Sequence, residues 1–336
     1  VVTGEAEGVW LDVLEDVRHG CLKKLYEGGL AEIGSIPAAR HDALPAKYAF
    51  GAVQTTRGCP LNCSFCSVTA FNGTHYRMRP IADVVREFQM IREKRVLIVD
   101  DNLVGIRSEH ITRAKDLFRA MIKAKVKKEW IAQATINFAD DEELLDLAAK
   151  AGCRGVFIGF ESPTPEGLRE LSKKFNIQQG RDFRASVRQI QRHRILVAGS
   201  FIIGLDIDEP GIGKHVAKTA SQYGVDHLNA LFLTPLPGTR LWDQMENDGR
   251  IVFNSFPDDW KYYTLTYPVA QYKHLSLDDI SEDMLSCDRT FYSMPRILRR
   301  VWNNIWGRRQ PLISLVGNLS YRKNLQLNIE AYKEFK

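Results

Sequence analysis

The segment Thr56-Arg57-Gly58-Cys59-Pro60-Leu61-Asn62-Cys63-Ser64-Phe65-Cys66 directly follows the first of a series of short apolar runs. It places three cysteines at the spacing C-x3-C-x2-C, so three thiolates can surround one inorganic cluster from a single loop. Iron–sulfur clusters normally take four cysteine ligands. Three ligands leave one iron with an open coordination position, where chemistry on a bound molecule can take place. We therefore predict that Cys59, Cys63 and Cys66 hold a 4Fe-4S cluster.

Two other kinds of site compete with this prediction. A structural zinc site would use His75 as its fourth ligand, but such sites usually show two paired knuckles, and the second is missing. An electron-transfer ferredoxin loop would need a fourth cysteine at close spacing. Neither Cys21 nor Cys153 has that spacing. A loop placed after the first strand of an alternating series favours the cluster with an open iron.

Short apolar runs alternate with amphipathic stretches between about residues 51 and 246. Six runs are candidate strands: Gly51–Thr56, Val96–Asp100, Trp130–Ile136, Gly155–Phe160, Val197–Gly204 and Leu228–Leu233. Helical spacing lies between them, around residues 81–91, 111–121, 144–148, 183–190 and 211–222, and a further helix opens near Thr239.

This alternation predicts an α/β fold of right-handed βαβ units with a parallel sheet. Six units fall short of the eight in a closed barrel. An open, partial barrel with six strands and six helices fits, with its chemistry at the carboxyl ends of the strands. A doubly wound sheet would give the same alternation, so periodicity alone does not choose between the two.

The cysteine spacing, with the aromatic Phe65 before the last cysteine, resembles the signature of the radical S-adenosylmethionine (radical SAM) superfamily. The resemblance covers about residues 51–246 and implies a partial TIM-like barrel. It also implies that the open iron chelates the amino and carboxylate groups of SAM. One electron from the reduced cluster cleaves the sulfonium, and the resulting 5′-deoxyadenosyl radical abstracts hydrogen from a substrate. An external electron donor such as flavodoxin or ferredoxin is implied as a partner.

The resemblance assigns cofactor contacts to the ends of the second and fourth strands. Asp101 and Asn102 stand where the superfamily often has Gly-Gly-Glu, and both side chains can accept the same hydrogen bonds from the methionine amino group. Glu161 and Ser162 resemble the position of the ribose and methionine contacts. The competing explanation for each pair is a helix cap or a turn.

Two further segments resemble those that lie beside the adenine. Residues 200–206 contain Gly204 and match the fifth-strand segment, although core packing explains most of that stretch. Thr234, Pro235 and Leu236 open residues 234–241, where two prolines and a glycine fix an irregular backbone. No catalytic acid or base is predicted, and four histidines are taken as structural or surface residues: His75, His110, His193 and His227.

Residues 4–10 resemble the end of a Rossmann-like cobalamin-binding domain, in which Gly-Glu closes the last strand. Residues 67–80 are also similar to the branch that contains hopanoid methylases and the anaerobic magnesium-protoporphyrin ester cyclase. The cobalamin-ligating motif Asp-x-His-x-x-Gly does not occur in this sequence, and the nearest string, residues 16–20, has the wrong spacing. We therefore expect cobalamin to be bound by an upstream domain that is missing from this chain.

With cobalamin, the resemblance implies methyl transfer to an unactivated carbon of a lipid or another hydrophobic small molecule. One SAM would methylate cobalamin, and a second would generate the radical. Radical cyclisation or oxidation of a tetrapyrrole is the alternative among enzymes. A non-catalytic iron–sulfur protein is the alternative from a different class, and such a protein would not need Glu161 or the turn at residues 234–241.

The composition is that of a soluble globular protein, with 44% hydrophobic and 26% charged residues among 336. No apolar run approaches the ~20 residues that a membrane span requires. Six cysteines, three of them close together, are too few and too uneven for a disulfide framework. We expect a reducing compartment, with the cytoplasm as the default.

The positive charge is concentrated at the carboxyl end of the chain. Residues 289–336 carry ten Lys and Arg against two Glu, a net charge of +8, which leaves 5 − 8 = −3 for the remainder. Three interpretations compete for the Arg- and Trp-containing residues 294–309. They are an accessory helix packed on the barrel with a solvated arginine face, a peripheral contact with the inner face of an anionic membrane and, third, nucleic-acid binding, for which no recognised fold is present.

These observations divide the chain into four parts. They are a remnant of the upstream cobalamin-binding-like domain (1–25), a linker (26–50), the radical SAM core (51–246) and a mostly helical C-terminal accessory region with the basic aromatic tail (247–336).

Overall fold

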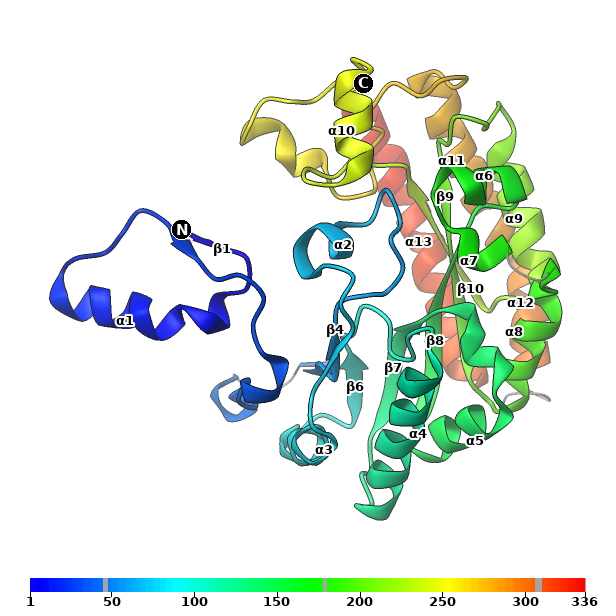
Figure 1. The fold of residues 1–336 in the computed structure, drawn as a ribbon. Coiled ribbons are helices and arrows are strands. Elements are labelled where there is room, and N and C mark those ends of the chain that lie inside the picture. Colours follow the sequence, from blue (N-terminus) through cyan, green and yellow to red (C-terminus); the bar gives the residue numbers. More distant parts are fainter. Residues whose placement is uncertain (45–47, 178–179, 306–309, 336) are drawn as a thin grey trace.

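In the computed structural model, which describes residues 1–44, 48–177, 180–305 and 310–335, six strands form one parallel sheet. They are, in chain order, β3 (Gly51–Val53), β6 (Arg95–Ile98), β7 (Glu129–Ala134), β8 (Cys153–Glu161), β9 (Leu196–Ile203) and β10 (His227–Phe232). Each strand lies beside the next one along the chain (Figure 1). A doubly wound sheet reverses its strand order at a switch point. The sequential order therefore identifies the partial barrel and confirms the predicted fold class.

Helices cover the outer side of this sheet. They are α3 (Ile81–Met90), α4 (Ser108–Lys123), α5 (Glu142–Lys150), α8 (Phe183–Arg192) and α9 (Ile212–Tyr223). Local sequence explains where several of them begin, because Asp141 and Asp182 accept hydrogen bonds from backbone N–H groups in the first turns of α5 and α8. In the core between sheet and helices, the rings of Phe118 and Trp130 stack with centroids 5.4 Å apart.

The first predicted strand, Gly51–Thr56, is divided in the structure. β3 stays in the sheet, whereas β4 (Thr56–Arg57) leaves it and pairs antiparallel with β5 (Arg77–Met78). The other five predicted strands agree with the structure to within two residues at each end. The short elements that complete the barrel are α2 (Ser67–Asn72), α6 (Pro165–Glu170), α7 (Lys174–Ile177) and α10 (Arg240–Asn247).

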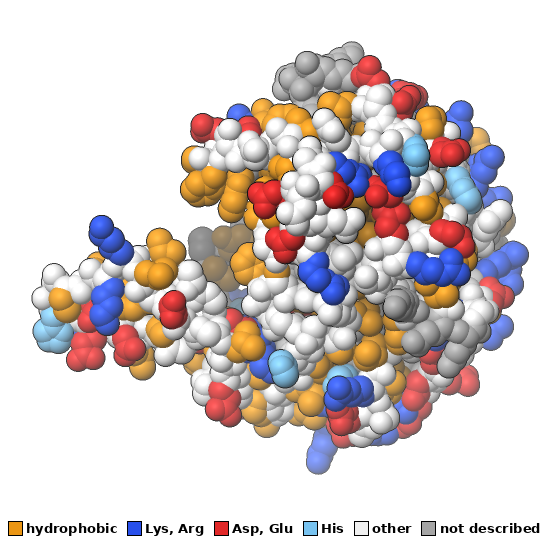
Figure 2. Space-filling model, turned by 45° about the horizontal axis from the view of Figure 1, so that its top comes forward, with side chains coloured by type: hydrophobic (Ala, Val, Ile, Leu, Met, Phe, Trp, Pro, Cys, Tyr) orange, Lys and Arg blue, Asp and Glu red, His pale blue; other side chains and the backbone are white. Residues whose placement is uncertain are grey.

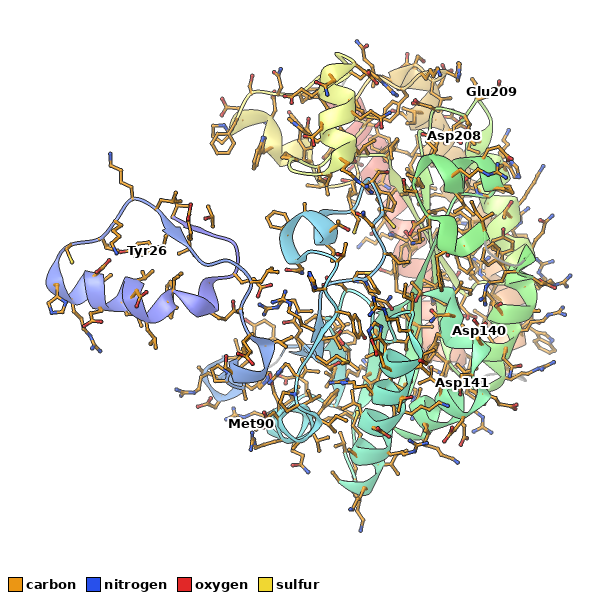
Figure 3. All side chains as sticks on the ribbon, in the orientation of Figure 1. Tyr26, Met90, Asp140, Asp141, Asp208 and Glu209 are labelled. Atoms are coloured by element: carbon orange, nitrogen blue, oxygen red, sulfur yellow. The ribbon has the colours of Figure 1, made fainter. Side chains whose placement is uncertain are left out.

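The N-terminal residues form a small unit of their own, which we call the N-terminal unit (residues 1–30). β1 (Val2–Thr3) and β2 (Tyr26–Glu27) pair in parallel and are joined through α1 (Trp10–His19). Figure 3 shows Tyr26 directed from β2 towards α1, where its hydroxyl donates to Asp16 at 2.7 Å. The unit projects from the barrel, and no residue of α1 is buried (Figures 1 and 2). The assignment of residues 1–25 to the remnant of a separate cobalamin-binding-like domain stays an interpretation.

The C-terminal region is mostly helical, as predicted. It contains α11 (Leu277–Phe291), α12 (Met294–Asn303) and α13 (Pro311–Phe335). α11 lies so close to α9 that a Cβ atom on Gly213 would fall 1.8 Å from the Asp283 carbonyl oxygen. Tyr292 binds both backbone groups of Leu228 through its hydroxyl, at 2.6 and 2.9 Å. The extension therefore covers β10, which is one of the two edge strands of the sheet.

The basic residues of this region do not all face solvent. Arg300 lies 4.0 Å from the ring centroid of Phe291 and donates to Asn318, and burial lowers its pKa to about 10. The burial of Arg300 against α11 and α13 agrees with the packing that the first interpretation of the tail expects, but not with a fully solvated arginine face. Residues 306–309 lie outside the described residues. Within the described part of the chain, no helix has the length and apolar character needed to cross a bilayer.

The described residues also include 3-10 segments at Ala6–Gly8, Ile33–Ser35, His41–Ala43, Ile136–Asp140 and Asp258–Tyr262.

Candidate active site

The three predicted ligands lie on one loop that is closed at its base by β4 and β5. Residues 58–76 run between these two strands, and α2 begins immediately after Cys66. Gly58 starts the loop with φ +86°, and a Cβ atom there would fall 2.2 Å from the carbonyl oxygen of His75. A glycine is therefore required at this point, both for its backbone conformation and for the close approach of the two ends of the loop.

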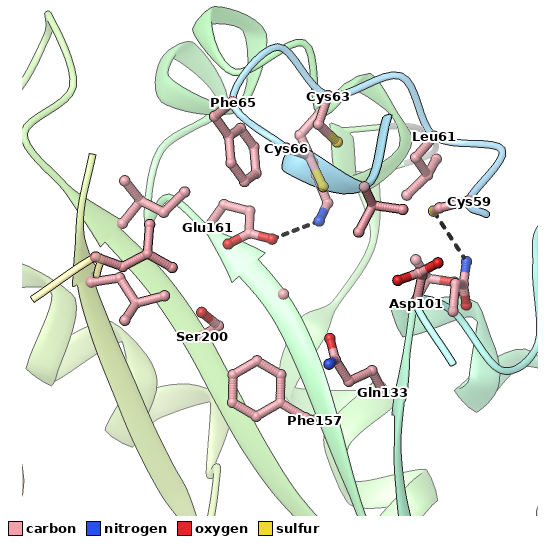
Figure 4. Close-up of a pocket in the computed structure, with 18 of the residues that line it drawn as sticks. Cys59, Leu61, Cys63, Phe65, Cys66, Asp101, Gln133, Phe157, Glu161 and Ser200 are labelled. Atoms are coloured by element: carbon pink, nitrogen blue, oxygen red, sulfur yellow. Dashed lines mark hydrogen bonds and ion pairs between the residues drawn. The ribbon is translucent and has the colours of Figure 1, made fainter. Parts of the chain in front are cut away.

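The loop covers a cavity of about 210 Å³ at the carboxyl ends of the parallel strands (Figure 4). All three cysteines line it, together with side chains from β7, β8, β9 and β10. In a barrel of parallel βα units this is the end at which active sites are found. The residues that line it are Cys59, Leu61, Cys63, Phe65, Cys66, Val68, Asp101, Asn102, Gln133, Ala134, Thr135, Phe157, Gly159, Glu161, Lys173, Ser200, Ile202, Leu231, Phe232, Leu233, Thr234 and Leu265.

The three thiols are free, and their surroundings suit an iron–sulfur cluster. Burial raises the pKa of each thiol, that of Cys63 to about 12, while the nearby ammonium group of Lys173 acts in the opposite direction. Thiols that are buried in this way lose their protons when they coordinate a metal centre. The amide of Asn102 points at the Cys59 sulfur, with Nδ2 3.9 Å from Sγ. Hydrogen bonds to ligand sulfurs tune iron–sulfur clusters.

The other donors in the described ranges do not complete a different metal site. Cys153 and Cys287 are buried elsewhere, and Cys21 is exposed in the N-terminal unit. His75 is exposed and does not line the cavity. Nowhere among the described residues are three His, Cys, Asp or Glu side chains grouped tightly enough for one metal ion. Three thiols on one loop fit a polynuclear cluster with one open iron better than a mononuclear zinc site.

The acidic residues that follow β6 bind the backbone at the start of the cysteine loop. Asp100 is fully buried and binds the backbone and the hydroxyl of Thr55, both at 2.5 Å. One oxygen of Asp101, Oδ2, accepts hydrogen bonds from the Gly58 N–H at 3.0 Å and from the Asn72 amide at 3.1 Å. Asp101 therefore holds the first residue of the loop while it lines the cavity.

Glu161 ends β8 in a strained conformation and faces the cavity. Its φ is +67°, an uncommon value for a residue that is not glycine. Oε1 lies 2.6 Å from the Nζ of Lys173, and both side chains are more than nine-tenths buried. Figure 4 draws this ion pair as a dashed line beside Cys66. Strain at such a position is typical of a functional site.

The nine predicted cofactor residues separate into two groups. Phe65, Asp101, Asn102, Glu161 and Thr234 line the cavity, whereas Ser162, Gly204, Pro235 and Leu236 do not. The second group shapes turns at the rim. The hydroxyl of Ser162 accepts a hydrogen bond from the Thr164 N–H at 3.2 Å, Gly204 has φ +108° and donates to Asp208, and the Leu236 carbonyl accepts from Thr239.

Several lining residues carry no sequence signal that singles them out. Lys173 lies in a short irregular segment between α6 and α7, where a lysine is ordinarily a surface residue. Gln133, Phe157 and Ser200 project from the strands β7, β8 and β9, and inward and outward residues of a strand alternate. Leu265 comes from the C-terminal region, adopts φ +66° and accepts a hydrogen bond from the Phe232 N–H at the end of β10. The alternation could have identified the strand residues, but not Lys173 or Leu265.

Residues 53–210 match the family model of the Radical SAM superfamily. This chain carries a radical SAM domain. The matched residues include the cysteine loop, Asp101, Glu161 and Lys173, and they form most of the cavity described above. The resemblance inferred from the cysteine spacing is confirmed.

The named relatives include a hopanoid methylase, which is one of the proteins of the predicted branch. Bacteriochlorophyllide d C-12(1)-methyltransferase of Chlorobaculum tepidum is 28% identical over 314 residues, which cover 90% of this chain and 66% of the relative. Hopanoid C-2 methylase of Rhodopseudomonas palustris is 29% identical over 211 residues, 62% of this chain and 40% of the relative. The chain thus spans less than two thirds of the length of either relative.

A solved structure shares the fold of the radical SAM domain and of the regions that flank it. The cobalamin-dependent S-adenosylmethionine radical enzyme OxsB, with aqua-cobalamin and S-adenosylmethionine bound, superimposes with a TM-score of 0.65 at 15% sequence identity. The alignment covers 99% of this chain and 58% of OxsB. The partial barrel and its flanking segments are therefore an arrangement that occurs in this class of enzyme.

Proposed function

We propose that this chain is the radical-generating part of a radical SAM methyltransferase, with a 4Fe-4S cluster on Cys59, Cys63 and Cys66. The observation that carries the proposal is the set of three free thiols beside the buried Lys173–Glu161 pair in one cavity. Bound there, the cluster would supply one electron that cleaves the sulfonium of SAM into methionine and a 5′-deoxyadenosyl radical. An external one-electron donor such as flavodoxin or ferredoxin would reduce it.

The charged side chains of the cavity have the capacity to bind the methionine part of SAM. Lys173 uses one of its three N–H donors on Glu161, which leaves donors for a carboxylate. Asp101 uses Oδ2 on the cysteine loop, and Oδ1, which makes no hydrogen bond to the residues that the structure describes, can accept from an amino group. Asn102 would tune the reduction potential of the cluster through its hydrogen bond to the Cys59 sulfur. Phe65 offers an apolar surface next to the last cysteine ligand.

The remaining predicted contacts are assigned to the nucleoside of SAM. Glu161 Oε2 makes no hydrogen bond to the described residues and would accept from the ribose hydroxyls. Ser162 would act indirectly by holding the turn that follows Glu161. Thr234 lines the cavity, and Gly204, Pro235 and Leu236 shape the backbone at its rim. The edge of the adenine would bind to this backbone.

The substrate is proposed to be a lipid or another hydrophobic small molecule. The cavity wall away from the cysteines is built from Phe157, Ile202, Leu231 and Leu265. Gln133 is exposed to the cavity and makes no side-chain hydrogen bond to the described residues, so it can bind one polar group of a largely apolar molecule. Ligand sites of this composition gain affinity from apolar area and orientation from a few polar groups.

Cobalamin is proposed to bind outside the residues of this chain. The sequence contains no Asp-x-His-x-x-Gly motif. The N-terminal unit has the parallel β-α-β arrangement found in Rossmann-like folds. Relatives named as methyltransferases and the cobalamin-dependent fold neighbour support methyl transfer to an unactivated carbon.

A tetrapyrrole is the second candidate substrate. It is favoured by the relative whose name specifies bacteriochlorophyllide d. A tetrapyrrole is large and apolar, which agrees with the composition of the cavity wall. Radical cyclisation or oxidation of such a ring is the corresponding alternative reaction.

Peripheral membrane contact through α12 is proposed on a separate observation. Leu298 and Trp302 are 58% and 61% exposed on this helix, and the adjacent Arg299 is also exposed. Exposed large apolar side chains with arginine are typical of helices that lie in a membrane interface. Such a contact would bring the barrel to an apolar substrate held in a membrane.

Anaerobic reconstitution with iron and sulfide tests the cluster that this function requires. We expect about four irons per chain, and strong loss of iron in Cys63→Ser. Cys21→Ser is the matched control, because its thiol is exposed in the N-terminal unit and it should bind iron like the wild type. Equal iron content in Cys63→Ser and Cys21→Ser would contradict the proposal.

A further inference from the structure

The base of the cysteine loop has an unfavourable arrangement of charge. β4 and β5 consist of two residues each, and their register places Arg57 directly opposite Arg77. Like charges directly opposite each other destabilise an antiparallel pair. These two residue pairs nevertheless close the base of the whole loop, residues 58–76, that carries the three thiols. The closure therefore needs an opposite charge beside both arginines.

Glu5 of the N-terminal unit supplies this charge. Its Oε2 accepts from Arg57 Nη1 at 2.9 Å and from Arg77 Nη1 at 2.8 Å, and its Oε1 accepts from Arg77 Nη2. A further hydrogen bond comes from the Ala31 N–H at 2.8 Å. Glu5 is only 8% exposed. Arg77 makes the largest contribution to holding the pKa of Glu5 down, to about 2, so the carboxylate is charged at neutral pH.

Glu7 resembles Glu5 in sequence but not in position. It accepts from Arg57 Nη2 at 2.8 Å, forms no hydrogen bond or ion pair with Arg77 and has a side chain that is 36% exposed. A change at Glu7 therefore removes one partly solvated ion pair. A change at Glu5 leaves two like charges facing each other across the base of the loop.

The distance along the chain from this ion cluster to the metal ligands is short. Arg57 is followed by Gly58, whose N–H donates to Asp101, and then by Cys59. Arg57 is also bound by the side chain of Gln54, at 2.9 and 3.1 Å, so its guanidinium is fixed from three directions. A shift of Arg57 would thus reach the Cys59 thiol through a single intervening residue.

We infer that Glu5 is a positioning residue for the cysteine loop. Its carboxylate neutralises the Arg57–Arg77 pair, and in this way attachment of the N-terminal unit sets the geometry of the three thiols. The role belongs to residues of this chain and is independent of the substrate, of cobalamin and of the reaction that the whole protein catalyses.

Hydrogen–deuterium exchange on the full-length, metal-free chain tests the inference without any cofactor. We expect Glu5→Gln to speed amide exchange in peptides within residues 55–66 by about fivefold or more, because opening of the loop base becomes easier. Peptides from α4 and α5 should keep the wild-type rate. Glu7→Gln, the same chemical change two residues away, should alter exchange in the loop by less than about twofold.

A second readout follows the cluster itself after reconstitution. The electron paramagnetic resonance spectrum of the reduced cluster should change in Glu5→Gln, stay as in the wild type in Glu7→Gln and be partly restored in Glu5→Asp. Unchanged loop exchange in folded Glu5→Gln, or an equal change in Glu7→Gln, would overturn the inference, as would faster exchange spread evenly over the chain. If Glu5→Gln does not fold by circular dichroism, Arg77→Lys decides by the same criteria, because it keeps the charge and loses the two-point contact.

Discussion

Lys173 Nζ lies 2.6 Å from Glu161 Oε1, and this buried pair adjoins the three cysteine thiols. The two side chains come from different elements, because Glu161 ends β8 and Lys173 lies in the segment before α7. The sequence alone gives no sign that they form a pair. Neither charge is stable alone in such surroundings. Together they give the cavity one cationic and one anionic group, which matches the zwitterionic methionine part of SAM.

Replacing Lys173 is therefore expected to weaken binding of SAM. Lys173→Met keeps the length of the side chain and removes the charge, and we predict a rise in Kd of about tenfold or more, equivalent to ~1.4 kcal/mol. Titration calorimetry on the reconstituted protein measures it. Lys150→Met is the control, because Lys150 pairs with Asp146 on the exposed face of α5. The same Kd in both variants would refute the assigned role of Lys173.

The start of the cysteine loop should tolerate no side chain at Gly58. Gly58→Ala adds the cost of a positive φ, about 1 kcal/mol, and a contact of 2.2 Å with the His75 carbonyl oxygen. Gly73 also has a positive φ, +68°, but an added Cβ atom would meet nothing within 4 Å. We predict that Gly58→Ala loses iron on reconstitution while Gly73→Ala retains it. Similar iron content in the two variants would show that the close approach at Gly58 is unimportant.

Asp208 is expected to make stability fall as the pH rises. It is 3% exposed, it accepts from the N–H groups of Gly204 and Leu205 at 2.9 Å, and burial raises its pKa to about 6. Because the folded-state pKa lies above the unfolded value, the folded protein binds this proton more tightly. The resulting stabilisation is complete below about pH 4 and is lost as the pH rises through 6.

Asp208→Asn removes this titration and keeps a hydrogen-bond acceptor. Between pH 4 and pH 7.5, the free energy of unfolding of the variant should rise relative to that of the wild type by up to about 3 kcal/mol. The difference in Tm between the two proteins, measured by circular dichroism at both pH values, isolates this carboxyl from the others. A difference in Tm that does not change with pH would contradict the assignment.

The membrane proposal predicts weak, salt-sensitive binding to anionic vesicles through α12. Trp302→Ser should reduce the bound fraction of the full-length protein about twofold or more, and added salt should reduce it further. Phe256→Ser is the control, because Phe256 is 71% exposed in the segment between α10 and α11. Co-sedimentation with vesicles that is the same for all three proteins would count against the contact.

Much of the fold could be predicted because its determinants are local. The six strands follow from continuous apolar runs, and α5, α8 and α10 begin where an Asp or Thr side chain caps the first turn. The cysteine loop could be found because three cysteines at fixed spacing are rare without a metal. Sequence periodicity did not distinguish a partial barrel from a doubly wound sheet, since that difference depends on which strands are neighbours.

The site was less predictable because it depends on tertiary contacts. Lys173 could not be recognised, since its burial requires the carboxylate of Glu161. Ser162 follows Glu161 directly but lies outside the cavity lining, because the positive φ of Glu161 turns the chain at that point. Leu265 reaches the cavity from a region beyond the barrel. Each of these positions is set by the packing of segments that are distant in sequence or by an unusual backbone conformation.

If the cavity binds a cluster and SAM together, the reconstituted chain should cleave SAM reductively. The most direct measurement is the anaerobic incubation of the reconstituted chain with SAM and dithionite, followed by quantification of 5′-deoxyadenosine and methionine. We expect both products to form in equal amounts and neither to form with Cys63→Ser. A protein that holds its full complement of iron, is reduced by dithionite and yields neither product would contradict this expectation.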